Sequence, residues 1–406
     1  MDDQNASASP FGAATRASDY VEDADAVASP LMHTPASIAP ETAAGGVVAV
    51  PVTGGHEMSQ QAGPVGEHRL RSPHDRDASA SVLFKGLAPA APPQTTQPAK
   101  QGFRGFLAGL GLPVKPGAAE AAALAASAEA EARRLGDETT IRQATWTRAV
   151  SILVANPKGG TGKTPTTLAL GGVIASIRGG STAIIEVSDD PGALNFRAEG
   201  TPRLGIGELV RDVQGIRTAG QLTGYTAPQT SFANVIGSTG RRERLTGDDV
   251  VAVSRVIDEF YGIRVMDSGN QPTSTAFRGA VSVADVLVIP VLNAGDSVLE
   301  AIQLLEELRA DGGAPALLAD RAVAIRLTDG RPENDAVRAE VSRLLLDGGV
   351  RSIHEVPYDR HIAERGQLTL ASLDSSTRDA FASAAAAVVR ILQEAVAPAS
   401  NTNRKA

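Results

Sequence analysis

Short apolar runs alternate with stretches of helical periodicity through residues 150–396. The runs are rich in β-branched residues, which is typical of strands buried on both faces of a parallel sheet. We expect strands at 150–155, 182–187, 263–267, 285–291 and 322–327, and another around Ile353. Because helical stretches alternate with these strands, the pattern predicts an α/β fold with a doubly wound, mostly parallel sheet. Its ligand is expected at the carboxyl ends of the strands.

The helical stretches are recognised by apolar residues that recur three or four positions apart. After the first strand, Leu168, Leu170, Val173, Ile174 and Ile177 follow this spacing. Further helices are expected within 201–213 and at 297–309 and 375–396. The segment 117–135 is rich in alanine, and its high helix propensity predicts a helix that ends at Gly136.

The residues before 141 differ in composition from those that follow. Residues 1–100 are rich in Ala, Ser, Pro, Gly, Thr and Gln and carry a net charge of −5. Such a segment cannot bury enough apolar surface to offset its ordering entropy, so we expect a long disordered N-terminal extension. Residues 101–140 hold an apolar stretch with Phe103 and Phe106, either a docking motif or a linker, and the alanine-rich helix. The core domain is expected at 141–396 and a disordered tail at 397–406.

Composition narrows the setting of the protein. The chain has 406 residues, a net charge of −8 and no cysteine, so disulfides are excluded and a reducing cytoplasm is compatible. No apolar run reaches about 18 residues, so we expect no stable membrane insertion. The opening Met1-Asp2-Asp3 is not typical of a secretory signal, and we expect a cytoplasmic protein. Residues 150–406 carry a net charge of −4, which provides no general attraction to DNA.

The loop after the first strand carries the strongest chemical signal. Residues 157–164 read Pro-Lys-Gly-Gly-Thr-Gly-Lys-Thr, between a strand and a helix. Glycines let the chain curl so that successive N–H groups point at one phosphate, and the following helix adds the positive end of its dipole. Lys163 is expected to reach the β- and γ-phosphates, and the Thr164 hydroxyl to ligate Mg²⁺. We expect the nucleotide to be held by Gly159, Gly160, Thr161, Gly162, Lys163 and Thr164.

Acidic residues follow two other strands. Asp267 ends the strand at 263–267, where it is expected to hold Mg²⁺ together with Thr164. After the strand at 182–187 the register is open. Glu186 takes the first acidic position when counted from the strand, whereas Asp190 takes the second position when counted back from Pro191. Both are candidates for catalysis, and an acidic turn that caps the next element is the alternative.

Residues 158–164 resemble the deviant Walker A motif of ParA/MinD-type ATPases, and the resemblance extends over about 140–395. It implies a P-loop NTPase fold of the SIMIBI type that binds ATP and Mg²⁺. In that family the first lysine crosses an ATP-dependent homodimer to touch the partner's nucleotide, a role that falls on Lys158 here. The unstructured leader and the Gly-Phe-Arg-Gly-Phe patch at 102–106 are similar to members associated with actinobacterial type VII secretion or conjugative elements.

The chain departs from the family pattern in places. The family's usual Asp-Thr-Pro-Pro is Asp267-Ser268-Gly269-Asn270 here. The asparagine that reads adenine is missing, because the matching stretch, 325–328, is Ile-Arg-Leu-Thr. The turn at 357–359 is similar to the family's late Pro-x-Asp turn near the base.

The resemblance implies an ATPase that works as a dimerising positional switch for DNA partitioning or for a secretion or conjugation machine. Its activating partner protein is unknown. A nucleotide-dependent scaffold that hardly hydrolyses ATP is the alternative, and Glu186 and Pro165 favour it. DNA segregation would need a basic surface, for which Arg241, Arg242 and Arg244 are the first candidates; a solvated surface cluster is the other interpretation.

Proline at position 165 generates a prediction. In P-loops the backbone N–H at this place points at the α-phosphate, and proline has none. A hydrogen bond to a charged group is worth about 1.5–3 kcal/mol, so Pro165→Thr is expected to tighten ATP binding about ten- to a hundred-fold. The melting temperature of the nucleotide-free protein should change little, because proline is tolerated in the first helical turn. Calorimetric titration of both forms decides this, and equal dissociation constants would contradict it.

Overall fold

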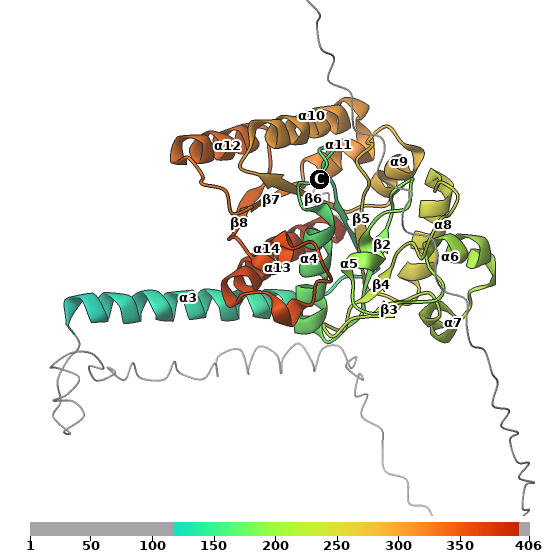
Figure 1. The fold of residues 1–406 in the computed structure, drawn as a ribbon, viewed down its shortest axis with the longest axis horizontal. Helices are drawn as coiled ribbons and strands as arrows, with labels where there is room; N and C mark the ends of the chain where they lie inside the picture. Colours follow the sequence, from blue (N-terminus) through green and yellow to red (C-terminus); the bar gives the residue numbers. More distant parts are fainter. Residues whose placement is uncertain (1–116, 398–406) are drawn as a thin grey trace, which may run out of the picture. The chain divides into compact units, whose positions relative to one another are not determined.

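The computed structural model describes residues 117–397, all of which lie in one compact unit. The centre of this unit is an eight-stranded sheet with the order β3-β4-β2-β5-β1-β6-β7-β8 (Figure 1). All neighbouring strands run parallel except β3 and β4, which pair antiparallel at one edge. The predicted extension at 1–100, the predicted docking motif and, apart from Ala397, the predicted C-terminal tail at 397–406 lie outside the described residues.

The strands and helices have these bounds in chain order. The strands are β1 (Val150–Val154), β2 (Thr182–Glu186), β3 (Ala227–Pro228), β4 (Asn234–Ile236), β5 (Ile263–Asp267), β6 (Val286–Leu292), β7 (Val323–Leu327) and β8 (Ser352–Val356). The α-helices are α3 (Ala118–Gln143), α4 (Lys163–Arg178), α5 (Leu194–Arg197), α6 (Ile206–Asp212), α7 (Ala219–Thr223), α8 (Gly247–Asp258), α9 (Thr275–Ser282), α10 (Gly295–Asp311), α11 (Gly313–Ala319), α12 (Asp335–Asp347), α13 (Arg360–Ala363) and α14 (Ser375–Val396). Two short 3₁₀ turns are η1 (Val213–Gly215) and η2 (Leu370–Ser372).

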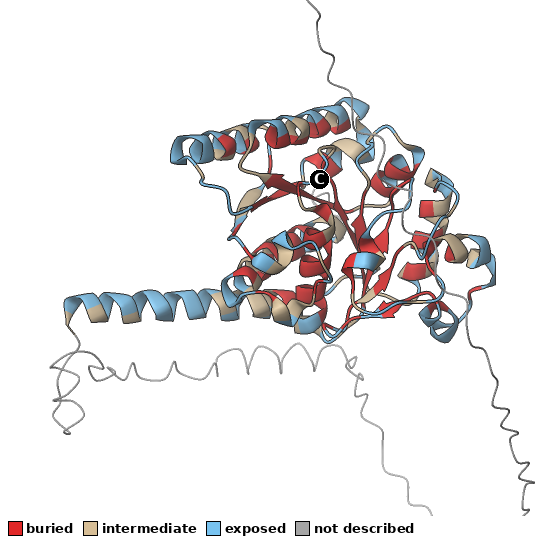
Figure 2. Cartoon of the chain, in the orientation of Figure 1, coloured by how far each residue is buried: buried red, intermediate tan, exposed pale blue. Residues whose placement is uncertain are grey.

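Helices cover both faces of the sheet, because the side chains of a strand alternate between its faces. On β1, Ile152 and Val154 face the core that α4, α14 and the end of α3 complete. Leu153 between them faces the second core, which α6, α8, α9, α10, α11 and α12 complete. The buried residues therefore form the strands and the inner helix faces, while the outer helix faces are exposed (Figure 2). This arrangement confirms the predicted doubly wound, mostly parallel sheet.

The N-terminal helix is longer than predicted. It continues through Gly136 to Gln143 because its last turns have tertiary partners. Ile141 is fully buried in the core, and Arg178 of α4 donates hydrogen bonds to the carbonyls of Ile141 and Ala144. Packing therefore outweighs the unfavourable helix propensity of a single glycine, about 1 kcal/mol. The expectation that the helix ends at Gly136 was wrong.

Parallel strands deliver their carboxyl ends to one edge of the sheet, and the candidate site lies at this edge. Glu186 at the end of β2 is directly opposite Asp267 at the end of β5, and Asp267 is opposite Val154 at the end of β1. The glycine-rich loop leaves β1 at this level and leads into α4. Within residues 117–397, no helix is both long enough and apolar enough to cross a membrane.

Candidate nucleotide-binding site

The glycine-rich loop adopts a curled backbone that two glycines make possible. Gly160 and Gly162 have φ values of 80° and 90°, in the left-handed region that residues with a Cβ rarely occupy. A Cβ at Gly162 would also lie 2.3 Å from the Leu327 side chain of β7. The Thr161 hydroxyl closes the loop by donating to the carbonyl of Lys158 at 3.3 Å. The curl predicted for a phosphate cradle is therefore present.

Lys163 lies inside this loop and is only 8% exposed. Its Nζ donates to the carbonyls of Asn156 at 2.8 Å and Lys158 at 3.1 Å, and also to Oδ1 of Asn270. Burial lowers the pKa of Lys163 to about 8, although the nearby Asp267 opposes the shift. All of its partners within the described residues are neutral, so a bound anion would stabilise its charged form.

Asn156, which the sequence analysis did not select, fixes the entrance of the loop. Its buried amide donates to the carbonyls of Pro290 at 2.9 Å and Ser297 at 3.2 Å. Its Oδ1 accepts a hydrogen bond from the backbone N–H of Lys158 at 2.9 Å. One side chain thus ties the loop to β6 and α10. A polar residue directly after a buried strand was the available signal.

Thr164 and Asp267, the two residues predicted to hold Mg²⁺, are in direct contact. The Thr164 hydroxyl donates to Oδ2 of Asp267 at 2.7 Å, and Thr167 donates to Oδ1 at 3.3 Å. Burial raises the pKa of Asp267 to about 7, with the charge of Glu186 adding to the shift. A buried carboxylate that lacks a full countercharge fits a cation, and carboxylate and hydroxyl oxygens are ligands that Mg²⁺ prefers. These residues therefore suit Mg²⁺.

Glu186 is buried beside Asp267, and its carboxylate is already occupied. Only 1% of the residue is exposed. Its Oε1 accepts from the backbone N–H of Gly192 at 3.0 Å, from the Ser238 hydroxyl and from Nη2 of Arg242 at 2.9 Å. Its Oε2 accepts from the backbone N–H of Ser238 at 3.4 Å. Glu186 lines the cleft, and three of the four hydrogen bonds that it accepts from the protein fall on Oε1.

Arg242 belongs to the interior rather than to a DNA-binding surface. Its side chain is 6% exposed. Beyond Glu186, it donates to the Ser238 hydroxyl at 2.8 Å and to the carbonyls of Ser188, Asp189, Asp190 and Glu243 at 2.6–3.0 Å. The hypothesis that Arg241, Arg242 and Arg244 form a surface cluster was wrong for Arg242, because Glu186 and these carbonyls draw it inward. Composition alone could not distinguish it from its exposed neighbours.

Two predicted catalytic residues lie outside the cleft. Asp190 is exposed and forms an ion pair with Arg244 at 3.0 Å. The Lys158 side chain is 43% exposed, and its Nζ lies 2.8 Å from Oδ2 of Asp296 at the start of α10. Asp296 raises the pKa of Lys158, so the lysine is charged and oriented away from its own loop's cradle. Glu186, not Asp190, therefore occupies the acidic position beside the loop.

The glycine loop and the carboxyl ends of β2, β5 and β7 border an open cleft of about 920 Å³. Gly160, Gly162, Lys163, Thr164 and Pro165 line one part of it, and Leu327, Thr328 and Asp329 line another. The volume is in the range of small-molecule sites. Arg326 does not reach the cleft, since its buried guanidinium contacts Glu355 and the Ser342 hydroxyl. The missing asparagine is therefore not replaced by Arg326; Thr328 and Asp329 are the polar groups at this end.

The fold and the glycine-rich loop are those of a P-loop domain. Its structure aligns with a ParA family ATPase from Chlorobium tepidum TLS at a TM-score of 0.50 and 13% identity, covering 59% of this chain and 98% of that chain. The MinD structure in the MinC:MinD complex of Aquifex aeolicus aligns at a TM-score of 0.44 and 18% identity, over 58% and 94% of the two chains. The first likeness confirms, at the level of the fold, the resemblance to ParA/MinD-type ATPases.

One curated relative is similar in sequence. The ESX-1 secretion-associated protein EspI of Mycobacterium tuberculosis is 27% identical over 233 residues, which cover 55% of this chain. The match spans about a third (34%) of the length of EspI. No protein-family model matches the chain.

The raised pKa of Asp267 generates a prediction about stability. The ionised side chain opposes folding fully above pH 7, and this cost disappears as pH falls from about 7 toward the unfolded value near 4. Asp267→Asn is therefore expected to raise the melting temperature of the nucleotide-free protein by about 5 °C or more at pH 8. The gain should shrink as pH falls through 6. The same variant should lose the strengthening of ATP binding by Mg²⁺.

Differential scanning fluorimetry across pH 5.5–8.5 measures the first effect and calorimetric titration the second. Asp190→Asn is the matched control, because Asp190 is exposed. A pH-independent difference, or Mg²⁺-dependent binding that persists in Asp267→Asn, would contradict the assignment.

The Glu186–Arg242 pair generates another prediction. Removing one partner of a buried ion pair leaves an uncompensated charge and typically costs about 3–5 kcal/mol, whereas an exposed pair is worth about 0–1 kcal/mol. Arg242→Gln should therefore lower the free energy of unfolding by several kcal/mol, and Arg244→Gln by less than about 1 kcal/mol. Adding Glu186→Gln to Arg242→Gln should recover part of the loss.

Urea denaturation of the four variants, including Glu186→Gln alone, gives the coupling between the two residues. Similar losses for Arg242→Gln and Arg244→Gln would show that the buried pair contributes no more than the exposed one.

Proposed function

We propose that the protein is an ATP-binding, Mg²⁺-dependent P-loop ATPase that acts as a nucleotide-driven, dimerising positional switch. The observation that carries this proposal is the contact of Thr164 with Asp267 beside the buried Lys163. Lys163 would hold the β- and γ-phosphates, the glycine loop would donate its N–H groups, and Thr164 and Asp267 would hold the metal. Bound Mg²⁺ would neutralise charge on the phosphates. The products are ADP and phosphate.

The environment of Glu186 supports slow turnover. A carboxylate that orients attacking water needs a free lone pair directed at that water. In this protein both Glu186 oxygens accept hydrogen bonds from the chain, and Arg242 neutralises its charge. Three of the four hydrogen bonds fall on Oε1, so only Oε2, which accepts a single bond at 3.4 Å, is left to orient a water molecule. This supports the alternative as well, in which the protein is a nucleotide-dependent scaffold that hardly hydrolyses ATP.

The cellular role follows from similarity rather than from geometry. The likeness to EspI favours association with a type VII secretion machine over DNA partitioning. The inward position of Arg242 and the pairing of Arg244 with Asp190 remove much of the charge suggested for non-specific DNA binding. An activating partner protein and a cytoplasmic location remain part of the proposal.

Dimerisation provides the direct test. Lys158 is exposed next to the glycine loop and held by Asp296 on the same chain, so it is free to exchange this partner for a nucleotide bound to a second copy. Lys158→Ala is expected to retain nucleotide binding by the monomer within about threefold and to lose ATP-dependent dimerisation. Asp296→Ala is the matched control: it removes the same ion pair but leaves the lysine, and should still dimerise.

Light scattering with ATP and Mg²⁺ reports the oligomeric state, and phosphate release reports turnover in the same samples. Wild-type protein that binds ATP without releasing phosphate would favour the scaffold. Absence of ATP binding would reject both versions, and a Lys158→Ala variant that dimerises normally would reject the role of Lys158.

A further inference from the structure

The segment 359–373 crosses from β8 toward α5, and we call it the strap. Three hydrogen bonds attach it to the end of α5. Leu368 N–H donates to the Arg197 carbonyl at 2.7 Å, Gln367 donates to the Ala198 carbonyl at 3.0 Å, and Arg197 Nη2 donates to the Ile362 carbonyl at 3.4 Å. The strap is anchored at its other end by Asp359, which accepts from the backbone N–H of Asp374 at 2.9 Å.

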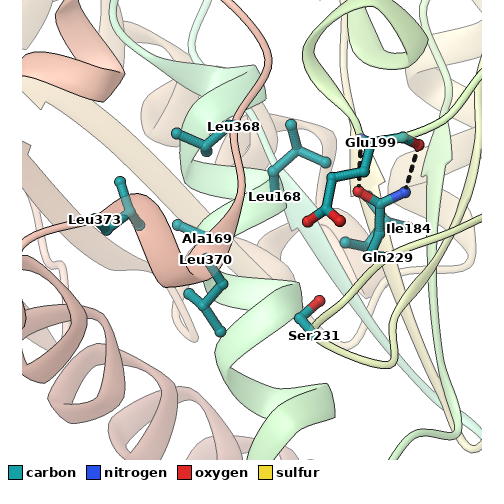
Figure 3. A pocket seen from close by; sticks show the side chains of 9 residues that line it. All are labelled: Leu168, Ala169, Ile184, Glu199, Gln229, Ser231, Leu368, Leu370 and Leu373. Atoms are coloured by element: carbon teal, nitrogen blue, oxygen red, sulfur yellow. Dashed lines mark hydrogen bonds between the residues drawn. The ribbon is translucent and has the colours of Figure 1, made fainter.

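Leucine side chains of the strap pack against α4 and so hold the strap in place. Figure 3 shows Leu368, Leu370 and Leu373 gathered beside Leu168 and Ala169 of α4. The space between them is about 10 Å³, which is room for at most one water molecule. This crevice is therefore a packing contact and not a ligand site. Its consequence is that the strap and α5 together form a fixed wall of the large cleft.

Arg197 lies in this wall, and no carboxylate of the described residues pairs with it. The residue is only 7% exposed and lines the cleft. Within residues 117–397 its buried Nε has no hydrogen-bond partner, and the hydrogen bond that its side chain does form is the long one to Ile362. Burial lowers the pKa of Arg197, and the neighbouring Arg365 lowers it further. Burying a guanidinium without a counterion costs free energy, so a bound anion would stabilise Arg197 in this position.

Arg365 brings a second positive charge to the same wall. It lines the cleft from the strap, at a residue with φ of 57°, and no described residue forms a side-chain hydrogen bond or ion pair with it. A non-glycine residue in the left-handed region stores about 1–3 kcal/mol and is found preferentially at functional sites. Two arginines are therefore directed to one cleft without an anion between them.

The carboxylates of the cleft have other partners within the described residues. Asp329 pairs with Arg331, and Glu186 pairs with Arg242. Asp267 accepts from two threonines, and Asp359 accepts from the backbone N–H groups of His361 and Asp374. None of these carboxylates forms an ion pair with Arg197 or Arg365, so an anion for the two arginines would come with a ligand.

We propose that Arg197 and Arg365 form an anion subsite in the cleft that takes a phosphate group, separate from the glycine loop. Arginine presents its N–H groups as a planar fork that suits phosphate oxygens. The phosphate belongs either to the bound nucleotide or to free orthophosphate. The nucleotide is a chemically reasonable source because Pro165, which also lines the cleft, supplies no N–H to the α-phosphate.

Removing one arginine tests the subsite. Arg365→Gln is the principal variant because Arg365 is exposed and its loss should not disturb folding; Arg197→Gln is the second. Arg360→Gln is the matched control, since Arg360 is an exposed arginine of the same strap that does not line the cleft. Calorimetry measures the affinities for adenosine, ADP and ATP. Thermal shift measures stabilisation by orthophosphate, with the glycine loop filled by a non-hydrolysable ATP analogue.

If the subsite holds a phosphate of the nucleotide, both variants should bind ADP and ATP about tenfold or more weakly than the wild type does, and their affinity for adenosine should be unchanged. If the subsite holds free orthophosphate, orthophosphate should raise the melting temperature of the wild type in the presence of the analogue, and both variants should lose this increase. Unchanged affinities and thermal shifts in Arg365→Gln would overturn the subsite, whatever Arg197→Gln does. If the wild type binds neither ATP nor the analogue, the proposed function fails; orthophosphate alone then tests the subsite by the same comparison.

Discussion

Two carboxylates buried side by side constrain the whole site. Because β2 and β5 are parallel and in register, Glu186 and Asp267 end their strands at the same level. Each must find partners at the sheet edge, since an isolated buried charge is far too costly. Glu186 is paired with Arg242, from the segment before α8, and Asp267 accepts hydrogen bonds from two hydroxyl groups of α4. These contacts with the two carboxylates position the first turn of α4, the loop that leads into it and the turn at 188–192.

The two carboxylates are satisfied differently, and this separates their roles. Arg242 supplies a full positive charge to Glu186, together with hydrogen bonds that hold the carbonyls of the adjacent turn. Asp267 receives only neutral hydroxyl donors, and its raised pKa reflects that deficit. A divalent cation at Asp267 would not displace an ion pair, whereas Glu186 already holds one with Arg242.

The sequence predicted the sheet well because its signals are local. Buried strands and the last helix are visible as apolar patterns, and β5 and α14 were placed with the bounds that the structure shows. The glycine loop and Asp267 were selected because their residue types and spacing follow the P-loop pattern, and the structure places Thr164 of that segment against Asp267. Their roles toward phosphate and Mg²⁺ stay predictions. The β3–β4 pair was missed since its strands are two and three residues long and carry no periodicity. The role of Arg242 could not be predicted because it depends on a contact 56 residues away in the chain.

The helix α3 has a mechanical consequence. At about 1.5 Å per residue, its 26 residues extend roughly 39 Å. Within it only Ile141, near the C-terminal end, is buried, while Arg134 forms ion pairs along the exposed stretch with Glu131 and Glu138. Such pairs stiffen an isolated helix. The helix is thus packed near its C-terminal end, so its length sets the distance between Ala118 and the core, and a force applied at Ala118 would act on the contacts that Arg178 makes with Ile141 and Ala144.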